Sequence, residues 1–380
     1  MVSRNSAIKF ITVLLATVCI VLAGCFSSPE TEKESLKITP AQLTLREGET
    51  RTLTVNISSG AEWLSENENI VTVDDGGTVT AVAVGETKVL ALKGSLSAEC
   101  SVTVIKDDSP VNGYALFWSD EFDGESLDSE KWGYQLGTRD DYGNSQGPAN
   151  WGNDEMQFYR EENVKVKDGN LIITAQKEDE KIGGKSYTSG RITTRGKFSF
   201  TYGYVEARIK SPKGDGMWPA FWMLPQPPTT QNSHNEYGGW ARNGELDIME
   251  AKGRLNNVVD TTLHFGDNWP KAQRKGKSTT LASDIDKWHT YAVDWRKESI
   301  AWIVDGSEVL RLKYTDWWTA AVSSDINPYA PFDKPFFILL NLAVGGTYDP
   351  TGTANFKEKD DFVSASMFVD YVRVYAPKNQ

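Results

Sequence analysis

Apolar and polar residues alternate along much of this chain with the period of β-strands, and the pattern falls into two stretches. In the first, from about residue 35 to residue 104, short apolar runs are separated by turn sequences at 74–77 and 84–86. The alternating apolar positions there are Leu43, Leu45, Leu53, Val55 and Ile57. Short strands at this turn spacing, without helical periodicity, predict a small all-β sandwich.

The second stretch reaches the end of the chain and predicts a larger all-β domain. Its strand-like runs are 171–174, 204–209, 289–295, 301–304, 336–340 and 368–374. In the run 204–209, Val205, Ala207 and Ile209 alternate with other residues, so one face should lie in a core and the other should face solvent or a cleft. The pattern lacks long amphipathic helices, which favours two stacked antiparallel sheets over an α/β barrel.

The first residues form a targeting segment rather than part of a fold. Arg4 and Lys9 precede an apolar run, 10–22, that is too short to cross a membrane comfortably. The sequence Leu-Ala-Gly-Cys at 22–25 resembles the lipobox of bacterial lipoproteins, in which the chain is cut before a cysteine that carries the lipid. We therefore expect an exported protein, anchored through Cys25 to the bacterial membrane at the cell surface or the periplasmic face. The alternative is ordinary signal cleavage beside a coincidental cysteine.

These patterns give the expected domain boundaries. Residues 1–24 are the signal peptide, 25–34 a Ser-, Pro- and Glu-rich tether, 35–106 the small sandwich, and 112–380 the large domain. A polar linker that contains a proline separates the last two.

Composition narrows the class of partner. With 40 basic and 52 acidic residues the net charge is −12, which disfavours binding to nucleic-acid phosphates. The 13 tryptophans hint at carbohydrate, because flat sugar faces dock on indole rings, although many should simply fill the core. Of three cysteines, Cys19 leaves with the signal, so no intrachain disulfide framework is expected and Cys100 should be a buried apolar residue. Three histidines without a cysteine cluster argue against a catalytic zinc, and we expect a monomer without a catalytic cofactor.

The segment 244–250, Gly-Glu-Leu-Asp-Ile-Met-Glu, carries the candidate chemistry. On a regular strand Glu245 and Asp247 share one face, whereas Glu250 falls on the other because its spacing from Glu245 is odd. One β-bulge near Met249 would insert an extra residue and bring all three carboxylates together. Crowded carboxylates can lie on a solvated sheet edge, but they also push their pKa values apart, which yields the nucleophile and the acid that glycoside hydrolysis requires.

The motif Glu-x-Asp-x-x-Glu and its surroundings resemble glycoside hydrolase family 16, in particular its laminarinase-like branch. The matching segments are 118–123, 151–155, 189–191, 217–225, 238–245, 262–266, 341–346 and 369–375. They cover essentially the whole second domain in order. The resemblance implies a concanavalin-like β-jelly-roll sandwich with a concave cleft, and hydrolysis with retention of configuration. Segments 38–40 and 79–81, with Trp63 and Gly85, resemble a bacterial immunoglobulin-like domain of the Big type, usually a spacer and alternatively a glycan binder.

The family resemblance also implies roles for individual residues. Glu245 would be the nucleophile, Asp247 its supporting carboxylate and Glu250 the acid/base. The residues expected to line the sugar subsites are Asn153, Arg191, Trp218, Trp222, Trp240, His264 and Trp269. Core packing remains an alternative for Trp218 and Trp222, as does a structural role for His264. Family members often bind one structural Ca²⁺, for which the matching positions are Glu121, the Gly169 carbonyl and Asp370.

The substrate expected from the resemblance is β-1,3-glucan of the laminarin type, cleaved by an endo-acting enzyme. The odd spacing of the motif argues against the lichenase-like and xyloglucan-active branches. Segments 239–240 and 268–270 look most like those of laminarinases. Mixed-linkage glucan, agar and carrageenan remain alternatives, as does a non-catalytic β-glucan-binding protein, although both candidate glutamates are present.

Overall fold

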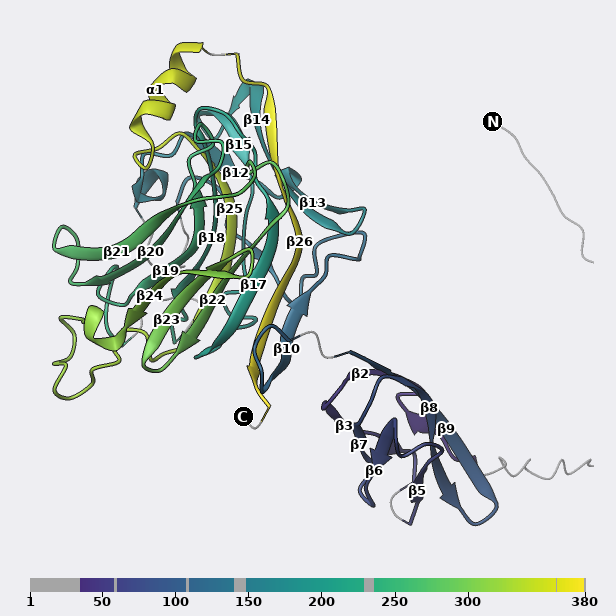
Figure 1. The fold of residues 1–380 in the computed structure, drawn as a ribbon. Coiled ribbons are helices and arrows are strands. Elements are labelled where there is room, and N and C mark those ends of the chain that lie inside the picture. The colour runs from purple at the N-terminus through teal and green to yellow at the C-terminus, as the bar shows by residue number, and fades with distance from the viewer. Residues whose placement is uncertain are drawn as a thin grey trace, which may run out of the picture. The chain divides into compact units, whose positions relative to one another are not determined.

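The computed structural model describes residues 35–57, 60–106, 109–139, 148–228, 236–359 and 361–378. The expected signal peptide, tether and lipidation site at Cys25 lie outside these residues. The chain divides into two compact units, Met1–Lys106 and Asp107–Gln380 (Figure 1). Within the described part, no helix combines the length and apolar character needed to cross a bilayer.

The first unit is the small β-sandwich predicted from the alternating pattern. One sheet has the order β2-β9-β8-β5, a second the order β3-β7-β6, and β1 pairs with β4. The strands are β1 (Ile38–Thr39), β2 (Gln42–Arg46), β3 (Thr50–Thr52), β4 (Thr54–Val55), β5 (Glu62–Ser65), β6 (Val71–Val73), β7 (Thr78–Ala81), β8 (Gly85–Lys93) and β9 (Leu96–Ile105). Leu45, Leu53, Val79 and Val89 lie in its core, and Cys100 is buried there as a free thiol, as expected.

The second unit consists of two packed sheets in its described residues (Figure 1). The first, called the ten-stranded sheet, has the order β12-β15-β14-β26-β17-β22-β23-β24, with β10 paired to β26 and β13 to β14. Its strands are β10 (Tyr114–Asp120), β12 (Gln157–Tyr159), β13 (Val164–Lys167), β14 (Asn170–Ile182), β15 (Lys185–Ser189), β17 (Gly203–Lys210), β22 (His289–Arg296), β23 (Ser299–Val304), β24 (Ser307–Lys313) and β26 (Ser364–Pro377).

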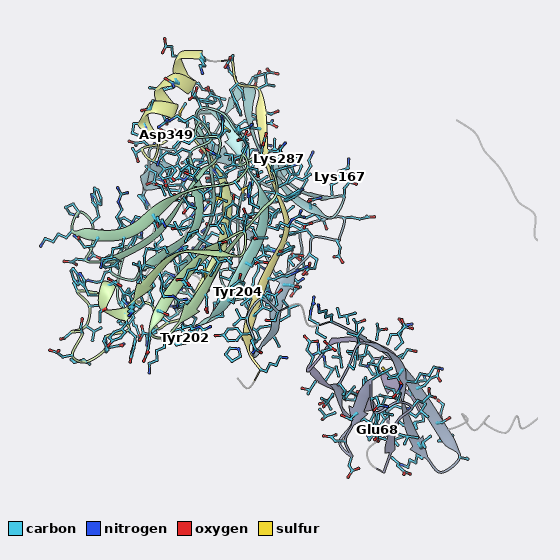
Figure 2. The ribbon with its side chains drawn as sticks, viewed as in Figure 1. Glu68, Lys167, Tyr202, Tyr204, Lys287 and Asp349 are labelled. Atoms are coloured by element: carbon cyan, nitrogen blue, oxygen red, sulfur yellow. The ribbon has the colours of Figure 1, made fainter. Side chains whose placement is uncertain are left out.

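The other, called the seven-stranded sheet, has the order β11-β16-β25-β18-β19-β20-β21. Its strands are β11 (Gly133–Tyr134), β16 (Arg191–Thr193), β18 (Met217–Pro225), β19 (Glu245–Ala251), β20 (Val258–Gly266), β21 (Ala272–Thr280) and β25 (Phe336–Val344). Short 3-10 helices occur at η1 (Ala149–Gly152), η2 (Glu161–Asn163) and η3 (Tyr314–Asp316). The helix α1 (Pro350–Lys359) begins beside Asp349, labelled in Figure 2, whose carboxylate accepts hydrogen bonds from Arg254 at 2.8 and 2.9 Å.

Period-two alternation explains how the two sheets share one core. Val205, Ala207 and Ile209 of β17 are fully buried, whereas the residues between them are partly exposed. This alternation confirms the predicted core face. The central strand β25 is buried along its whole length, as its apolar sequence requires. Burial of the facing side chains supplies most of the drive for this packing. The fold class is therefore the predicted pair of β-sandwiches.

Candidate active site

The strand β19 carries the three acidic residues of the motif and contains the predicted bulge. Against β20, Asp247 pairs with Thr262 and Glu250 pairs with Asp260. The chain therefore advances three residues along β19 but only two along β20, which defines a β-bulge. Against β18, the register shifts between Asp247 and Met249, which makes Ile248 the extra residue. The bulge expected near Met249 is thus confirmed, centred one position earlier.

The bulge separates apolar from acidic side chains on this strand. Leu246, Ile248 and Met249 are at most 1% exposed and belong to the core between the sheets. Glu245 and Glu250 are only partly buried and lie on the opposite face with Asp247, which is 3% exposed. The structure therefore turns all three carboxylates toward the outer face of the seven-stranded sheet.

Trp302 supports this irregular backbone from the other sheet. Its indole Nε1 donates a 2.8 Å hydrogen bond to the backbone carbonyl of Asp247, and both groups are buried. A bulge disrupts the regular ladder, so a carbonyl beside it needs a partner from elsewhere. Trp302 comes from β23, and the sequence pattern placed it in the strand-like run 301–304 without predicting this role.

Each outer glutamate receives a hydrogen bond from a tryptophan. Trp240 Nε1 donates to Glu245 Oε2 at 2.9 Å, and Trp218 Nε1 donates to Glu250 Oε1 at 2.9 Å. These contacts fix the orientation of the two carboxyl groups. They also leave the second oxygen of each group available for chemistry.

His264 lies close to both Asp247 and Glu245. Its Nε2 is 3.3 Å from Asp247 Oδ2 and 3.9 Å from Glu245 Oε1. Asp247 Oδ2 is buried and makes no well-formed hydrogen bond to any described residue. One carboxylate oxygen of Glu245, one of Asp247 and one ring nitrogen of His264 lie within 4.8 Å of one another, so the charges of these groups interact.

Burial raises the pKa of all three carboxyl groups to about 8. For Glu245 and Glu250 the negative charge of Asp247 raises the pKa further, while His264 and the tryptophan hydrogen bonds lower it. The cluster therefore cannot carry three negative charges near neutral pH, since each ionisation makes the next one harder. A protonated acid can thus coexist with an ionised carboxylate in the same site.

A second aromatic and polar group lies on β16 and β18. The Arg191 guanidinium is 4.2 Å from the Trp151 ring centroid and 4.8 Å from that of Trp222, and its Nε donates to Gln135. Trp222 Nε1 donates to Asn341 Oδ1 at 2.8 Å. Trp222 is half-buried on the face of β18 opposite Phe221 and Met223, so it is not a core residue.

The remaining predicted binding residues form two neighbouring pairs, Asn153 with Trp218 and Trp240 with Trp269. A Cβ on Gly346 would lie 3.0 Å from the Asn153 carbonyl and 3.1 Å from Trp218, so these two residues meet at one glycine. Trp240 and Trp269 lie with ring centroids 6.4 Å apart and are 39% and 74% exposed. The tryptophans expected to bind sugar therefore lie near the acidic group rather than in the core, whereas the Asn153 side chain donates to the buried Glu155 at 3.4 Å.

Sequence reasoning missed two residues beside Glu250. The Tyr348 ring stacks on Trp218 at 4.7 Å, and its hydroxyl donates to Asp260 at 2.6 Å. Asp260 also pairs with Lys252 at 2.8 Å. Tyr348 follows a matching segment by two positions, but no spacing pattern distinguishes it from a loop tyrosine.

The three positions expected to hold calcium meet at one place in the ten-stranded sheet. β10 and β14 pair with successive stretches along one edge of β26, which brings Glu121 and Gly169 toward Asp370. In this arrangement the side chains do not fit a calcium ion. Arg373 donates to both Glu121 oxygens at 3.0 and 2.7 Å, and Arg208 donates to Asp370 Oδ2 at 2.8 Å. A cation would have to displace both arginines.

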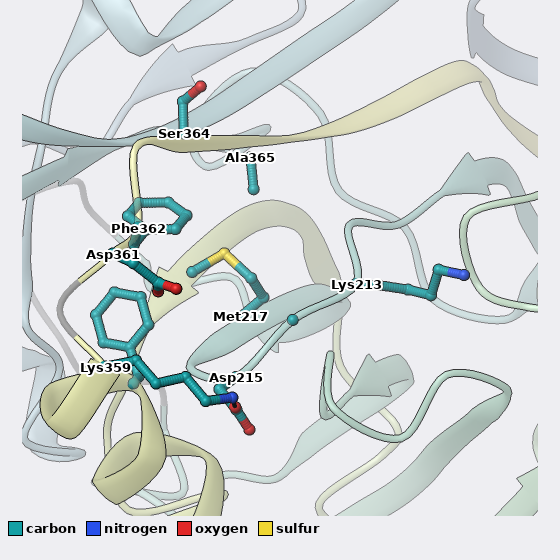
Figure 3. Close-up of a pocket in the computed structure, with 10 residues that line it drawn as sticks. Lys213, Asp215, Met217, Lys359, Asp361, Phe362, Ser364 and Ala365 are labelled. Atoms are coloured by element: carbon teal, nitrogen blue, oxygen red, sulfur yellow. Dashed lines mark hydrogen bonds and ion pairs between the residues drawn. The ribbon is translucent and has the colours of Figure 1, made fainter.

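A separate pocket of about 300 Å³ lies beside α1 (Figure 3). Met217 and Phe362 form apolar walls, and Lys359 donates to Asp215 across its rim at 2.6 Å. None of the three carboxylates of β19 lines it. Its ion pair is internally satisfied, so the pocket adds nothing to the acidic site.

Comparison with known proteins follows the same division of the chain. Residues 152–359 match the glycosyl hydrolases family 16, and residues 33–104 match the bacterial Ig-like domain, group 2. The chain belongs to glycosyl hydrolase family 16. The family 16 domain of this chain therefore follows an immunoglobulin-like domain, as the sequence motifs predict.

Several relatives of this family 16 chain are named for β-glucan. It is 41% identical over 283 residues to the glucan endo-1,3-beta-glucosidase A1 of Niallia circulans, a match that covers 70% of this chain and 39% of that protein. It is 39% identical over 267 residues to a beta-glucanase of Rhodothermus marinus, a match that covers 69% of this chain and 85% of that protein. The catalytic domain of an endo-1,3-beta-glucanase (laminarinase) from Thermotoga petrophila RKU-1 aligns with a TM-score of 0.58 and 34% identity, covering 71% of this chain and 100% of that domain.

Proposed function

We propose that this chain is a retaining endo-1,3-β-glucanase that cleaves laminarin-type polysaccharide by double displacement. The observation that carries the proposal is the bulge at Ile248, which turns Glu245, Asp247 and Glu250 to one open face of the sheet. The names of the relatives support β-1,3-glucan as substrate. The exposed indoles beside the carboxylates suit a polymeric sugar substrate.

Two steps account for the chemistry. Glu245, ionised, attacks the anomeric carbon while Glu250 gives its proton to the departing glycosidic oxygen, which leaves a glycosyl group covalently bound to Glu245. Glu250, now ionised, removes a proton from water, and that water displaces Glu245 with a second inversion. Two inversions give net retention. We expect the two carboxyl groups to lie about 5–5.5 Å apart, the separation typical of this mechanism.

Asp247 tunes both groups. When Asp247 is ionised, its charge opposes ionisation of Glu250 and so helps keep the acid protonated until the leaving oxygen needs the proton. His264, 3.3 Å from Asp247, acts in the opposite direction and lowers the pKa of both glutamates. The tryptophan donors hold the two glutamates in place, so little reorganisation is needed during reaction.

Purified protein should therefore hydrolyse laminarin in preference to lichenan, agarose and carrageenan, measured side by side as reducing ends and product lengths. Glu245→Gln is the matched control, because it keeps the shape of the site and removes the nucleophile. Binding of laminarin without turnover by the wild-type protein would favour a glucan-binding protein instead. Faster turnover of another polysaccharide would reassign the substrate.

We further propose that the mature protein is a monomer, exported and held at the bacterial membrane by lipid on Cys25. The apolar run 10–22, the Leu-Ala-Gly-Cys sequence and the polar tether support this. Cys25→Ser should move the protein from the membrane fraction to the soluble fraction. Unchanged membrane association would contradict the anchor.

A further inference from the structure

Three tryptophans are exposed among the described residues, and all three lie at the Glu245 end of the site. Trp240 is 39%, Trp318 42% and Trp269 74% exposed. Large apolar side chains left in contact with water at one place mark a binding surface more often than a packing fault. Trp240 and Trp269 were already expected to contact sugar, whereas Trp318 has no assigned role.

Arg242 joins the three segments that carry these rings. Its Nη2 pairs with Asp267 Oδ1 at 3.2 Å, two residues before Trp269. Its backbone carbonyl accepts a 2.7 Å hydrogen bond from Thr319 Oγ1, directly after Trp318. Arg242 itself follows Trp240 by two residues. The three loops are therefore held together by an ion pair and a hydrogen bond of Arg242.

Trp318 is held against the end of β20 on the face that carries the carboxylates. Asp260, Thr262 and His264 are the partly exposed residues of this strand, so period-two alternation puts Gly266 on the same face. A Cβ on Gly266 would meet Trp318 Cζ2 at 3.3 Å, and the Gly266 backbone bonds to the Trp318 carbonyl at 3.0 Å. The indole thus lies over a glycine on the same face of the seven-stranded sheet as His264.

The position of this ring is fixed by its neighbour. Trp317 is 3% exposed, packs edge-on against Phe332 at 5.4 Å and donates from Nε1 to the Tyr329 carbonyl. One indole of the pair anchors the loop in the core while the next is presented outward. A rigid, exposed aromatic ring loses little side-chain entropy when a ligand docks on it.

Arg274 adds polar donors beside the aromatic rings. It pairs directly with His264 across β20 and β21, and directly opposed residues share one face of a sheet. It is exposed, and within the described parts of the chain no carboxylate pairs with it. Its guanidinium is available to sugar hydroxyl groups.

We propose that Trp318 forms an outer glucan-binding subsite beyond Trp240 and Trp269, with Arg274 as a hydroxyl ligand at its edge. This inference rests on the proposed function. Its ligand is the part of a β-1,3-glucan chain that extends past the residues held at the scissile bond on the Glu245 side. The apolar face of a glucose ring would lie on the indole, so the subsite is filled by long chains and left empty by short ones.

The test compares chain lengths in the full-length protein. In Trp318→Ala, kcat/KM for long laminari-oligosaccharides should fall about tenfold, mainly through KM, which corresponds to ~1.4 kcal/mol of binding. For short oligosaccharides the fall should be twofold or less, on the order of ~0.4 kcal/mol. Trp318→Tyr should recover much of the loss, because it restores an aromatic platform. Phe117→Ala is the matched control, since Phe117 is 61% exposed on β10 of the other sheet.

Each outcome decides the inference. Equal losses on short and long substrates, or a lowered melting temperature in Trp318→Ala, would show a structural role and overturn it. No change on either substrate would also overturn it. If the wild-type protein fails to hydrolyse any laminari-oligosaccharide, the proposed function fails first. Normal wild-type hydrolysis with no length dependence in Trp318→Ala refutes the outer subsite alone.

Discussion

Replacing Asp247 by asparagine should stabilise the folded protein at alkaline pH while slowing the enzyme. Burial raises the pKa of Asp247 to about 8 from an ordinary value of 3.8, and its Oδ2 makes no well-formed hydrogen bond among the described residues. Between these pH values the folded protein binds more protons at this site than the unfolded chain does. Stability is therefore fully present below pH ~4 and is lost as the pH rises toward ~8.

The structure sets the size of this effect. A difference of about 4 pKa units corresponds to a ceiling of ~6 kcal/mol. Relaxation of the site and entry of water will partly solvate the ionised carboxylate, so we expect a gain of ~2 kcal/mol at pH 9. In a domain of this size that gain raises the melting temperature by about 4–8 °C. At pH 4 the carboxyl group is largely neutral, and Asp247→Asn should melt close to the wild type.

The assay is thermal unfolding at pH 4, 6.5 and 9, with Asp325→Asn as the control for an exposed aspartate. The pH–rate profile gives a second readout. Asp247 raises the pKa values of Glu245 and Glu250, so its neutralisation should move the alkaline limb of activity to lower pH. A stability difference that does not change with pH, or a loss of stability at pH 9, would refute this reasoning.

Three further predictions follow from the site and the metal positions. Glu245→Gln should abolish turnover of every substrate. Glu250→Gln should lower the turnover of laminarin about 10²–10⁴-fold, and substrates with activated aryl leaving groups, together with azide, should restore part of that turnover. Equal recovery in both variants would contradict the assigned roles. Trp302→Phe should lower the free energy of unfolding by ~1–3 kcal/mol, because it leaves the buried Asp247 carbonyl unpaired. It should also lower kcat with little change in KM. An unchanged melting temperature and an unchanged kcat would contradict a supporting role. Because Glu121 is held by an arginine, melting in calcium and in chelator should agree within about 1 °C, and a gain of several degrees would show that metal displaces the ion pairs.

Much of the fold and of the acidic site was predictable, because on a strand the odd or even spacing of two residues determines whether their side chains share a face. The odd spacing of Glu245 and Glu250 requires an inserted residue if both are to face one way, and the structure supplies it at Ile248. The alternation in 204–209 likewise identified the core face of β17. These predictions need only the local geometry of a strand.

Other features depend on contacts between distant segments and left no local signal. Trp302 reads as a core residue of β23, and only the bulge on a strand of the opposite sheet gives its indole a carbonyl partner. Glu121 and Asp370 were expected to hold calcium, but whether a carboxylate pairs with an arginine depends on side-chain orientation, which leaves no local signal in the sequence. The helix α1 contains glycine, asparagine and threonine, which are weak helix formers, and its sequence has no clear apolar stripe.

The most direct test of the central claim is the stereochemistry of laminarin hydrolysis, followed by proton NMR during the first minutes of reaction. If Glu245 is the nucleophile and Glu250 the acid/base, two inversions at the anomeric carbon must give a product whose new reducing end is first the β-anomer. Mutarotation should then produce the α-anomer more slowly. Initial appearance of the α-anomer would mean a single displacement by water, and would contradict the assigned roles of both glutamates.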